Sequence, residues 1–341
     1  MTRPYILFHA VGATDETFFS PVSRDNCAEP FIAFRERCRR LGYKVEATRD
    51  QLLEECEWIV FWDVYSLGPI NLRDYAAEVA KKVLRRGRRL RNVYREALAS
   101  ARPPKMALAV MEPPSITKKN LRTSAHERMD VVFTWNQEWI RRGGKYVSIL
   151  LPVTDEFPEV EKIPFGEKKL LVDISANKSS RHPAELYSAR REAIGFFQKR
   201  LPDGFDLYGV GWDREHYPLY RGMVEHKWDV MPRYRFVICY ENGVFPDYIS
   251  QRVFDVLRCN TVPVYWGATN VEEYIDSGAF VDRRRFSSNE ELAEYLTSVS
   301  EAEYEAMLAA GRGYLQSERF RRFLGSSWGD TLESAMGLKA R

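Results

Sequence analysis

The sequence lacks the short motifs that identify the commonest enzyme classes. It contains no G-x-x-x-x-G-K-[ST], no G-x-G-x-x-G and no G-x-S-x-G, which removes the simplest interpretations as an ATPase, a dinucleotide-dependent dehydrogenase or a serine hydrolase. It also lacks H-E-x-x-H, and its 5 histidines are scattered along the chain. A histidine-based metal centre is therefore not indicated, and we expect no metal requirement and no tightly bound cofactor.

Cysteine is also scarce. The 5 cysteines are an odd number and include no C-x-x-C pair; they are Cys27, Cys38, Cys56, Cys239 and Cys259. Isolated free cysteines are commonly small buried apolar residues. Neither a disulfide framework nor a zinc site is predicted.

Long hydrophobic runs are absent as well. No apolar run reaches the ~20 residues that cross a bilayer, and the first ten residues form one short apolar run before polar sequence rather than a signal peptide. We therefore expect a cytoplasmic protein without a transmembrane segment. The net charge of +3 is too small to argue for wrapping a polyanion, so nucleic acid is not an expected partner.

One segment is strongly basic, residues 81–91, with the sequence KKVLRRGRRLR. Such a segment could attract an anionic membrane surface or an anionic acceptor. Apolar residues at near-helical spacing favour instead a helix with one solvated face; they are Val83, Leu84, Leu90 and Val93. Weak peripheral membrane association is kept as the minor alternative.

The chain is long enough for two domains. It has 341 residues, 45% of them hydrophobic, which exceeds what one ordinary core covers. Each half alternates short apolar runs with amphipathic stretches, the pattern of a parallel sheet flanked by helices. Strands are expected at residues 5–9, 58–62, 106–111, 131–135, 170–174, 205–208, 236–240 and 262–266, and helices at 31–41, 185–199 and 249–258.

A proline-rich, charged stretch from Pro152 to Gly166 divides the two halves. We therefore predict an N-terminal domain at 1–155, a linker at 156–167, a C-terminal domain at 168–325 and a terminal helix or tail at 326–341. The expected fold is α/β, with two Rossmann-like domains that face each other across a cleft. Ligands of such domains bind at the carboxyl ends of the strands.

The most informative segment is 236–267, which alternates strand, polar loop, helix and strand. The first strand ends in Glu241 and Asn242, and the helix opens with Ser250, Gln251 and Arg252. Polar groups therefore gather at a strand's carboxyl end and a helix's amino end. Unpaired backbone N–H groups, the helix dipole and an arginine at such a place suit an anion, and a diphosphate is the expected ligand.

This segment resembles the donor-binding signature of the α-1,3-fucosyltransferases, glycosyltransferase family 10, which reads roughly F-x-x-x-F-E-N-S, D-Y-[IV]-T-E-K and P-V-x-x-G. The corresponding stretches are YENG at 240–243, DYISQR at 247–252 and VPVYWG at 262–267. Residues 185–191, 206–212 and 220–227 are similar to segments of bacterial members. In the first half the resemblance is limited to MEPP at 111–114, similar to the family's E-S-P, and to residues 133–135.

The resemblance implies a GT-B fold and an inverting transfer of fucose from GDP-fucose to a hydroxyl of a glycan acceptor. It implies that Arg190 and Arg252 hold the diphosphate, that Asn242 and Tyr248 contact the phosphate or fucose region, and that Gln251 faces the ribose. Ser250 and Glu241 complete the same donor motif. Because Arg191 adjoins Arg190, helix phase decides which of the two points inward.

Glu112 is the catalytic base that the resemblance implies. It follows an apolar strand and precedes two prolines, which would hold its loop rigidly. One carboxylate suffices, since a nucleoside diphosphate leaves without the acid that a glycosidase needs. Asp63 and Glu241 are the alternatives, although Glu241 is better placed to order its own loop by accepting backbone N–H bonds.

Two departures from the family pattern concern the donor. Gln251 and Arg252 stand where the family has glutamate and lysine, so an amide replaces a carboxylate and a planar fork replaces a compact ammonium. Two further hypotheses therefore remain: a transferase of the same fold that uses another nucleotide sugar, and a catalytically silent carbohydrate- or nucleotide-binding module. An active enzyme is favoured because phosphate ligands and base are retained together. The sequence does not identify the acceptor.

Overall fold

The computed structural model describes residues 4–10, 13–47, 53–69 and 92–341. The basic segment at 81–91, and with it the minor membrane hypothesis, lies outside these residues. The chain divides into two compact units: the first contains residues 1–23, 28–149 and 328–341, and the second contains 24–27 and 150–327. The expected linker at 156–167 thus lies inside the second unit, where it is irregular up to a 3-10 turn, η6 (Phe165–Glu167).

The first unit contains a six-stranded parallel sheet in the order β2-β1-β3-β4-β5-β6. Its strands are β1 (Tyr5–His9), β2 (Lys44–Glu46), β3 (Cys56–Trp62), β4 (Lys105–Val110), β5 (Val131–Thr134) and β6 (Tyr146–Ser148). Its helices are α1 (Asp15–Phe18), α2 (Glu29–Arg40), α4 (Val93–Ala99), α5 (Gln137–Arg141) and, from Trp328 onward, α11 (Gly325–Met336). The edge strands β2 and β6 were not predicted, because three residues are too short to show a period.

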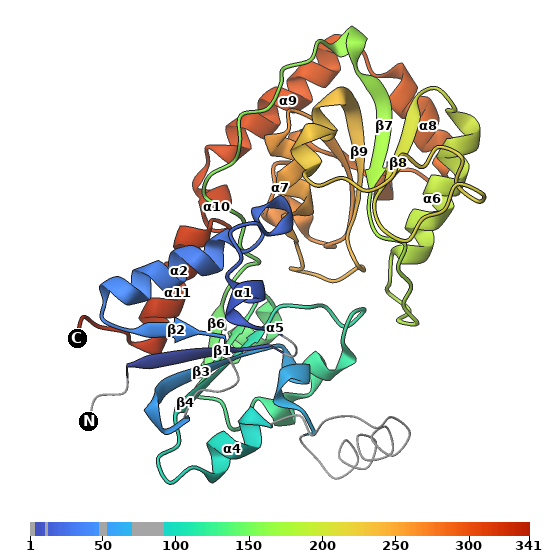
Figure 1. The fold of residues 1–341 in the computed structure, drawn as a ribbon. Coiled ribbons are helices and arrows are strands. Elements are labelled where there is room, and N and C mark those ends of the chain that lie inside the picture. Colours follow the sequence, from blue (N-terminus) through green and yellow to red (C-terminus); the bar gives the residue numbers. More distant parts are fainter. Residues whose placement is uncertain (1–3, 11–12, 48–52, 70–91) are drawn as a thin grey trace. The chain divides into compact units, whose positions relative to one another are not determined.

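Both faces of this sheet are covered, as a parallel sheet requires. Successive side chains of a strand point to opposite faces: Leu7 joins a buried cluster with α4, whereas Phe8 packs edge-on against Phe34 of α2. Phe34 in turn contacts Trp328 of α11. The last helix therefore completes the core of the first unit, beside α2 (Figure 1).

The second unit contains a five-stranded parallel sheet in the order β11-β10-β9-β7-β8. Its strands are β7 (Lys169–Ile174), β8 (Phe205–Tyr208), β9 (Tyr234–Tyr240), β10 (Val262–Trp266) and β11 (Val281–Asp282). Its helices are α6 (Tyr187–Arg200), α7 (Gln251–Arg258), α8 (Asn289–Ser298), α9 (Glu301–Leu315) and α10 (Glu318–Arg321). One core cluster packs α6 and α8 on the sheet, and another packs α7 and α10.

Ten short 3-10 turns accompany η6 in the connections of the described chain. They are η1 (Arg24–Asn26), η2 (Leu53–Glu55), η3 (Val64–Leu67), η4 (Lys118–Leu121), η5 (Thr123–Ala125), η7 (Lys227–Asp229), η8 (Met231–Arg233), η9 (Val271–Glu273), η10 (Ser277–Ala279) and η11 (Arg283–Arg285).

The two sheets share one topology. If each unit's strands are numbered from its own first strand, both sheets contain the order 2-1-3-4-5. The chain reverses direction across the sheet between β1 and β3 in the first unit and between β7 and β9 in the second. Ligands of open α/β sheets bind at the carboxyl ends of the strands at this switch point. The prediction of two parallel α/β domains is confirmed.

Candidate functional site

Glu241 organises the strand–loop–helix segment of the second unit. It follows β9 and is 0% exposed. Its Oε1 accepts a hydrogen bond from the backbone N of Ser250 at 2.8 Å, and its Oε2 accepts one from the Ser250 hydroxyl at 2.7 Å. Ser250 is the N-cap of α7. The carboxylate therefore determines where α7 begins, the role that its position in the sequence favoured.

Gly267 makes room for this carboxylate. A Cβ at Gly267 would lie 2.4 Å from the Cγ of Glu241 and 2.6 Å from the Tyr265 hydroxyl. The backbone N of Glu241 also donates to the Trp266 carbonyl at 2.8 Å. The glycine of the VPVYWG stretch is thus required by the close approach of β10's end to Glu241, a packing reason that the sequence did not reveal.

Arg190, in the first turn of α6, points into the unit. It is 2% exposed, and its Nη2 donates to the backbone carbonyls of Tyr240 and, at 3.0 Å, Glu241. Arg191 is partly exposed and donates to the Lys178 carbonyl and the Ser188 hydroxyl. The phase of helix α6 thus directs Arg190 inward, where its hydrogen bonds stabilise the end of β9.

Two cations and two anions meet at the switch point of the second sheet. Asp173 of β7, which the sequence analysis missed, is 0% exposed and accepts a hydrogen bond from the Ser175 hydroxyl. Burial raises the pKa of Asp173 and of Glu241, and the charges of Arg190 and Arg252 oppose this. Burial and Arg252 together lower the pKa of Arg190 to about 10. The sequence feature that could have identified Asp173 is its position as an acidic residue within the apolar run of the strand sequence KLLVDI.

Arg252 lies at the outer side of this group. It is the second residue of α7 and is partly exposed. Burial disfavours its charge, but Glu241, Cys239, Tyr248 and Asp173 together outweigh burial, so the pKa of Arg252 is raised. Since Arg190 is buried and already bonded to carbonyls, Arg252 is the arginine of this group that retains some exposed surface.

Asn242, Tyr248 and Gln251 border the same helix end. The side-chain amide of Asn242 donates to the Tyr248 hydroxyl at 3.3 Å, and Tyr248 is 1% exposed. Gln251 is the first residue of α7 and is partly buried. The structure therefore brings the predicted donor residues together; their ligand contacts remain predictions.

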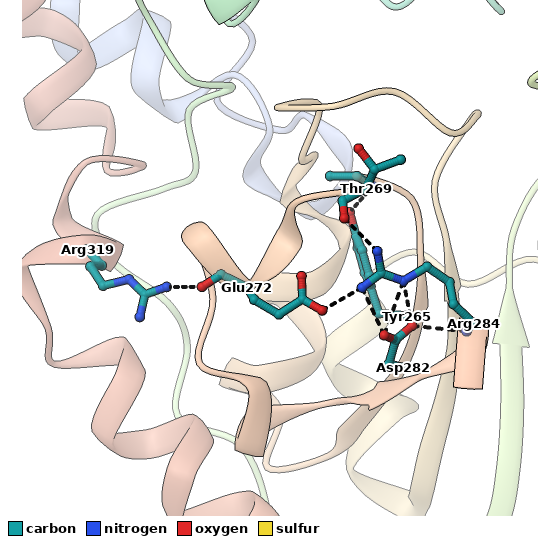
Figure 2. Close-up of polar contacts among 7 residues, drawn as sticks. Tyr265, Thr269, Glu272, Asp282, Arg284 and Arg319 are labelled. Atoms are coloured by element: carbon teal, nitrogen blue, oxygen red, sulfur yellow. Dashed lines mark hydrogen bonds and ion pairs between the residues drawn. The ribbon is translucent and has the colours of Figure 1, made fainter. Parts of the chain in front are cut away.

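An ion-pair network stabilises the loop after β10 (Figure 2). Arg284 bonds Asp282 of β11 at 2.8 Å, Glu272 at 2.6 Å and the Thr269 carbonyl at 2.7 Å. Arg319 of α10 donates to the Glu272 carbonyl at 2.6 Å. The network thus ties this loop to β11 and α10, next to the turn that contains Gly267.

In the first unit, Glu112 is the second residue after β4 and is partly exposed. Its backbone N donates to Oδ1 of Asp63 at 3.0 Å, and the two prolines after it are buried. Tyr65 is 37% exposed; burial, followed by the charges of Asp63 and Glu112, raises its pKa. The tyrosine therefore lies within electrostatic range of both carboxylates.

Two features are absent from the part of the chain that the structure describes. No group of three or more His, Cys, Asp and Glu side chains there could hold a metal ion. None of the helices in the described part of the chain has the length and apolarity needed to cross a membrane.

Sequence comparison matches the region of the second unit that contains Glu241, Ser250 and Arg252. Residues 174–308 match the family model "Glycosyltransferase family 10 (fucosyltransferase) C-term". An Arabidopsis thaliana alpha-(1,4)-fucosyltransferase is 30% identical over 92 residues, which are 26% of this chain and 23% of that protein. The matched segment thus spans about a quarter of the relative's length.

Structural comparison extends over both units. An alpha1,3-fucosyltransferase solved with GDP-fucose has a TM-score of 0.58 at 10% identity, over 98% of this chain and 90% of that one. Anabaena HepE in complex with UDP and glucose has a TM-score of 0.55 at 12% identity, over 98% and 99%. At such identities the likeness concerns the fold, and it confirms the expected GT-B class.

Proposed function

Because residues 174–308 match glycosyltransferase family 10, we propose that the protein transfers fucose from GDP-fucose to a hydroxyl of a glycan acceptor with inversion at the anomeric carbon. The observation that carries this proposal is the partly exposed Arg252 at the amino end of α7, inside the segment that matches the family. An arginine fork at the amino end of a helix suits a diphosphate. On this proposal the second unit binds the donor and the first unit serves the acceptor.

Arg190 and Arg252 have different roles in this proposal. Arg252 contacts the diphosphate directly. Arg190 is buried against the carbonyls of Tyr240 and Glu241. It therefore stabilises the loop after β9, which borders the donor, and contributes positive electrostatic potential from the protein interior. Asn242, Tyr248, Ser250 and Gln251 border the donor at the same helix end, and Glu241 holds that end in place.

Glu112 is the proposed base. The acceptor oxygen forms a bond to the anomeric carbon as the bond from that carbon to the GDP oxygen breaks, and the acceptor's proton passes to the Glu112 carboxylate. The departing diphosphate keeps its negative charge, which cationic and N–H groups stabilise without an acid. Asp63 is disfavoured as the base because it is 0% exposed, whereas Glu112 is partly exposed.

A thermal-shift comparison of nucleotides tests the donor. A ligand that binds only the native state raises its stability, by about 2.7 kcal/mol at a hundredfold excess over Kd. We expect GDP and GDP-fucose to raise the Tm at sub-millimolar concentration and UDP-glucose and UDP-GlcNAc to have no effect. The Arg252→Ala variant is the control in which the GDP shift should largely vanish.

The two other hypotheses give different results in this assay. A larger shift with a UDP-sugar would replace fucose by another donor, consistent with the fold shared with Anabaena HepE. Binding of GDP-fucose with neither hydrolysis nor transfer to any acceptor in a glycan panel would identify a silent binding module.

A further inference from the structure

Four main-chain polar groups around Glu112 are held by buried side chains from other segments. The N–H groups of Met111 and Glu112 both donate to Oδ1 of Asp63, at 2.8 and 3.0 Å. The Glu112 carbonyl accepts from the Asn120 side-chain amide at 2.8 Å. The Met111 carbonyl accepts from the Trp135 indole N–H at 2.9 Å. The backbone that carries the proposed base is therefore fixed on both sides of the peptide.

The holding groups are themselves bound to one another. The Asn120 amide also donates to Oδ1 of Asp63 at 2.7 Å, and its oxygen accepts from the backbone N of Val64 at 2.9 Å. Asp63 is 0% exposed and Asn120 is 2% exposed. Because buried hydrogen bonds in a low-dielectric interior are costly to break, Asp63 and Asn120 act as one rigid pair.

The backbone of Asp63 is in an unfavourable conformation. Its φ is 59° and its ψ is 158°, close to a region that is essentially reserved for glycine and that costs about 1–3 kcal/mol for other residues. Asp63 directly follows β3, whose neighbour β4 leads into Glu112, and its own backbone N donates to the Ala109 carbonyl at 2.8 Å. The strained turn points its carboxylate at the next strand's end.

We propose that Asp63, together with Asn120, is a positioning residue that fixes the Met111–Glu112 backbone and so presents the Glu112 carboxylate for proton transfer. This inference rests on the proposed function for its catalytic consequence. A misplacement of about 1 Å can reduce turnover by about 100-fold. Asp63 contributes through Glu112 and not through the donor.

Hydrogen exchange tests the positioning itself, without any activity. Pro113 and Pro114 have no N–H, so Met111 and Glu112 supply both exchanging amides of residues 111–114. In Asp63→Ser their exchange should accelerate by roughly 10-fold or more, because each loses its acceptor. Asp63→Asn keeps an acceptor oxygen, so it should retain much of the protection.

Kinetics in a double-mutant cycle test the consequence. Asp63→Ser should lower kcat by roughly 10- to 100-fold and change the Kd of GDP less than about twofold. In the Glu112→Gln background the same substitution should have almost no further effect, because no base remains to be positioned. Asp206→Asn is the matched control: Asp206 is a buried carboxylate of β8 that bonds Lys169, Arg221 and Tyr234, and its loss should lower the Tm but not kcat.

The outcomes separate this inference from the proposed function. Unchanged exchange at Met111 and Glu112 in Asp63→Ser would overturn the positioning role whatever the activity. The positioning role would also be overturned if the kcat of the double variant were reduced by the product of the two single-variant reductions. Such independence would mean that Asp63→Ser causes a structural defect that does not act through Glu112. A wild-type protein with normal exchange protection that uses no nucleotide sugar would overturn the proposed function and leave the Asp63–Asn120 arrangement standing.

Discussion

The Glu241 carboxylate accepts two hydrogen bonds from Ser250, one from its backbone N at 2.8 Å and one from its hydroxyl at 2.7 Å. Ser250 is the ninth residue after Glu241, and the pair connects the end of β9 to the N-cap of α7. Any shift of Glu241 must therefore move the first turn of α7, where Arg252 lies.

Gly267→Ala should destabilise the second unit and weaken GDP binding. The added methyl would lie 2.4 Å from the Glu241 Cγ, and overpacking of this kind costs about 1–3 kcal/mol. Gly195→Ala in α6 is the control: its Cβ would meet nothing within 4 Å, so the helix should gain about 0.5–1 kcal/mol. Urea denaturation and calorimetry with GDP measure both effects. Equal stability of the two variants would show that Glu241 can move aside.

Arg252→Ala should weaken GDP binding by about 1.5–3 kcal/mol, the usual scale for hydrogen bonds to a charged group. Arg252→Lys should recover part of the loss, because it restores the charge without the planar fork. Arg190→Ala should weaken GDP binding similarly and should also lower the Tm, since it leaves two carbonyls without their buried donor and removes a charge that stabilises buried Asp173. Calorimetry provides the affinities. Arg191→Ala, which alters a partly exposed side chain, should be nearly neutral; sensitivity there with a silent Arg190 would contradict the assignment.

Glu112→Gln should separate binding from chemistry. A base interacts with the acceptor's proton chiefly in the transition state, so donor affinity should stay almost constant while turnover falls by a factor on the order of 100 or more. The paired measurements are donor affinity by calorimetry and initial transfer rate, with donor hydrolysis as a substitute assay. Normal turnover would redirect attention to Asp63, and a joint loss of binding and rate would make Glu112 a structural residue.

His126 should make the first unit less stable in mild acid. It is 1% exposed and packs against Trp139 with a ring-centroid separation of 4.8 Å, and its Nδ1 is 3.3 Å from the Tyr146 hydroxyl. Burial, with the positive charges of Lys145 and Arg142, lowers its pKa to about 4. In the unfolded chain His126 is therefore protonated below about pH 6.5, whereas in the folded protein it stays neutral down to about pH 4.

The sign follows from this difference in proton binding. Stability from neutral His126 is complete above pH ~6.5 and is lost as the pH falls toward 4, by up to about 3 kcal/mol. Urea denaturation at several pH values should show that the difference in the free energy of unfolding between wild type and His126→Gln becomes smaller as the pH falls from about 6.5 to about 4. His216→Gln, in an exposed side chain, controls for the loss of a histidine elsewhere. A constant difference between wild type and His126→Gln would refute the prediction.

Local patterns located most of the fold. The strands predicted at residues 5–9, 205–208 and 262–266 have those bounds, because continuous apolar runs between turn residues are a local property of parallel sheets. The short edge strands β2 and β6 were not predicted, because strands of 3 residues are too short to show a period. The motif at 236–267 likewise indicated the strand end and helix start that gather the polar groups.

The sequence by itself indicated the resemblance to glycosyltransferase family 10, the two α/β halves and the segments in which the candidate residues stand. Only the tertiary structure decided that Arg190 rather than Arg191 points inward, that Asp173 joins the charged group and that Asp63 holds the Glu112 backbone. The physical reason is that each of these depends on residues from separate strands, or from helix α6 and a strand end, that meet only in the folded chain. Strand order brings β3 beside β4 and β7 beside β9, and no local periodicity encodes that order.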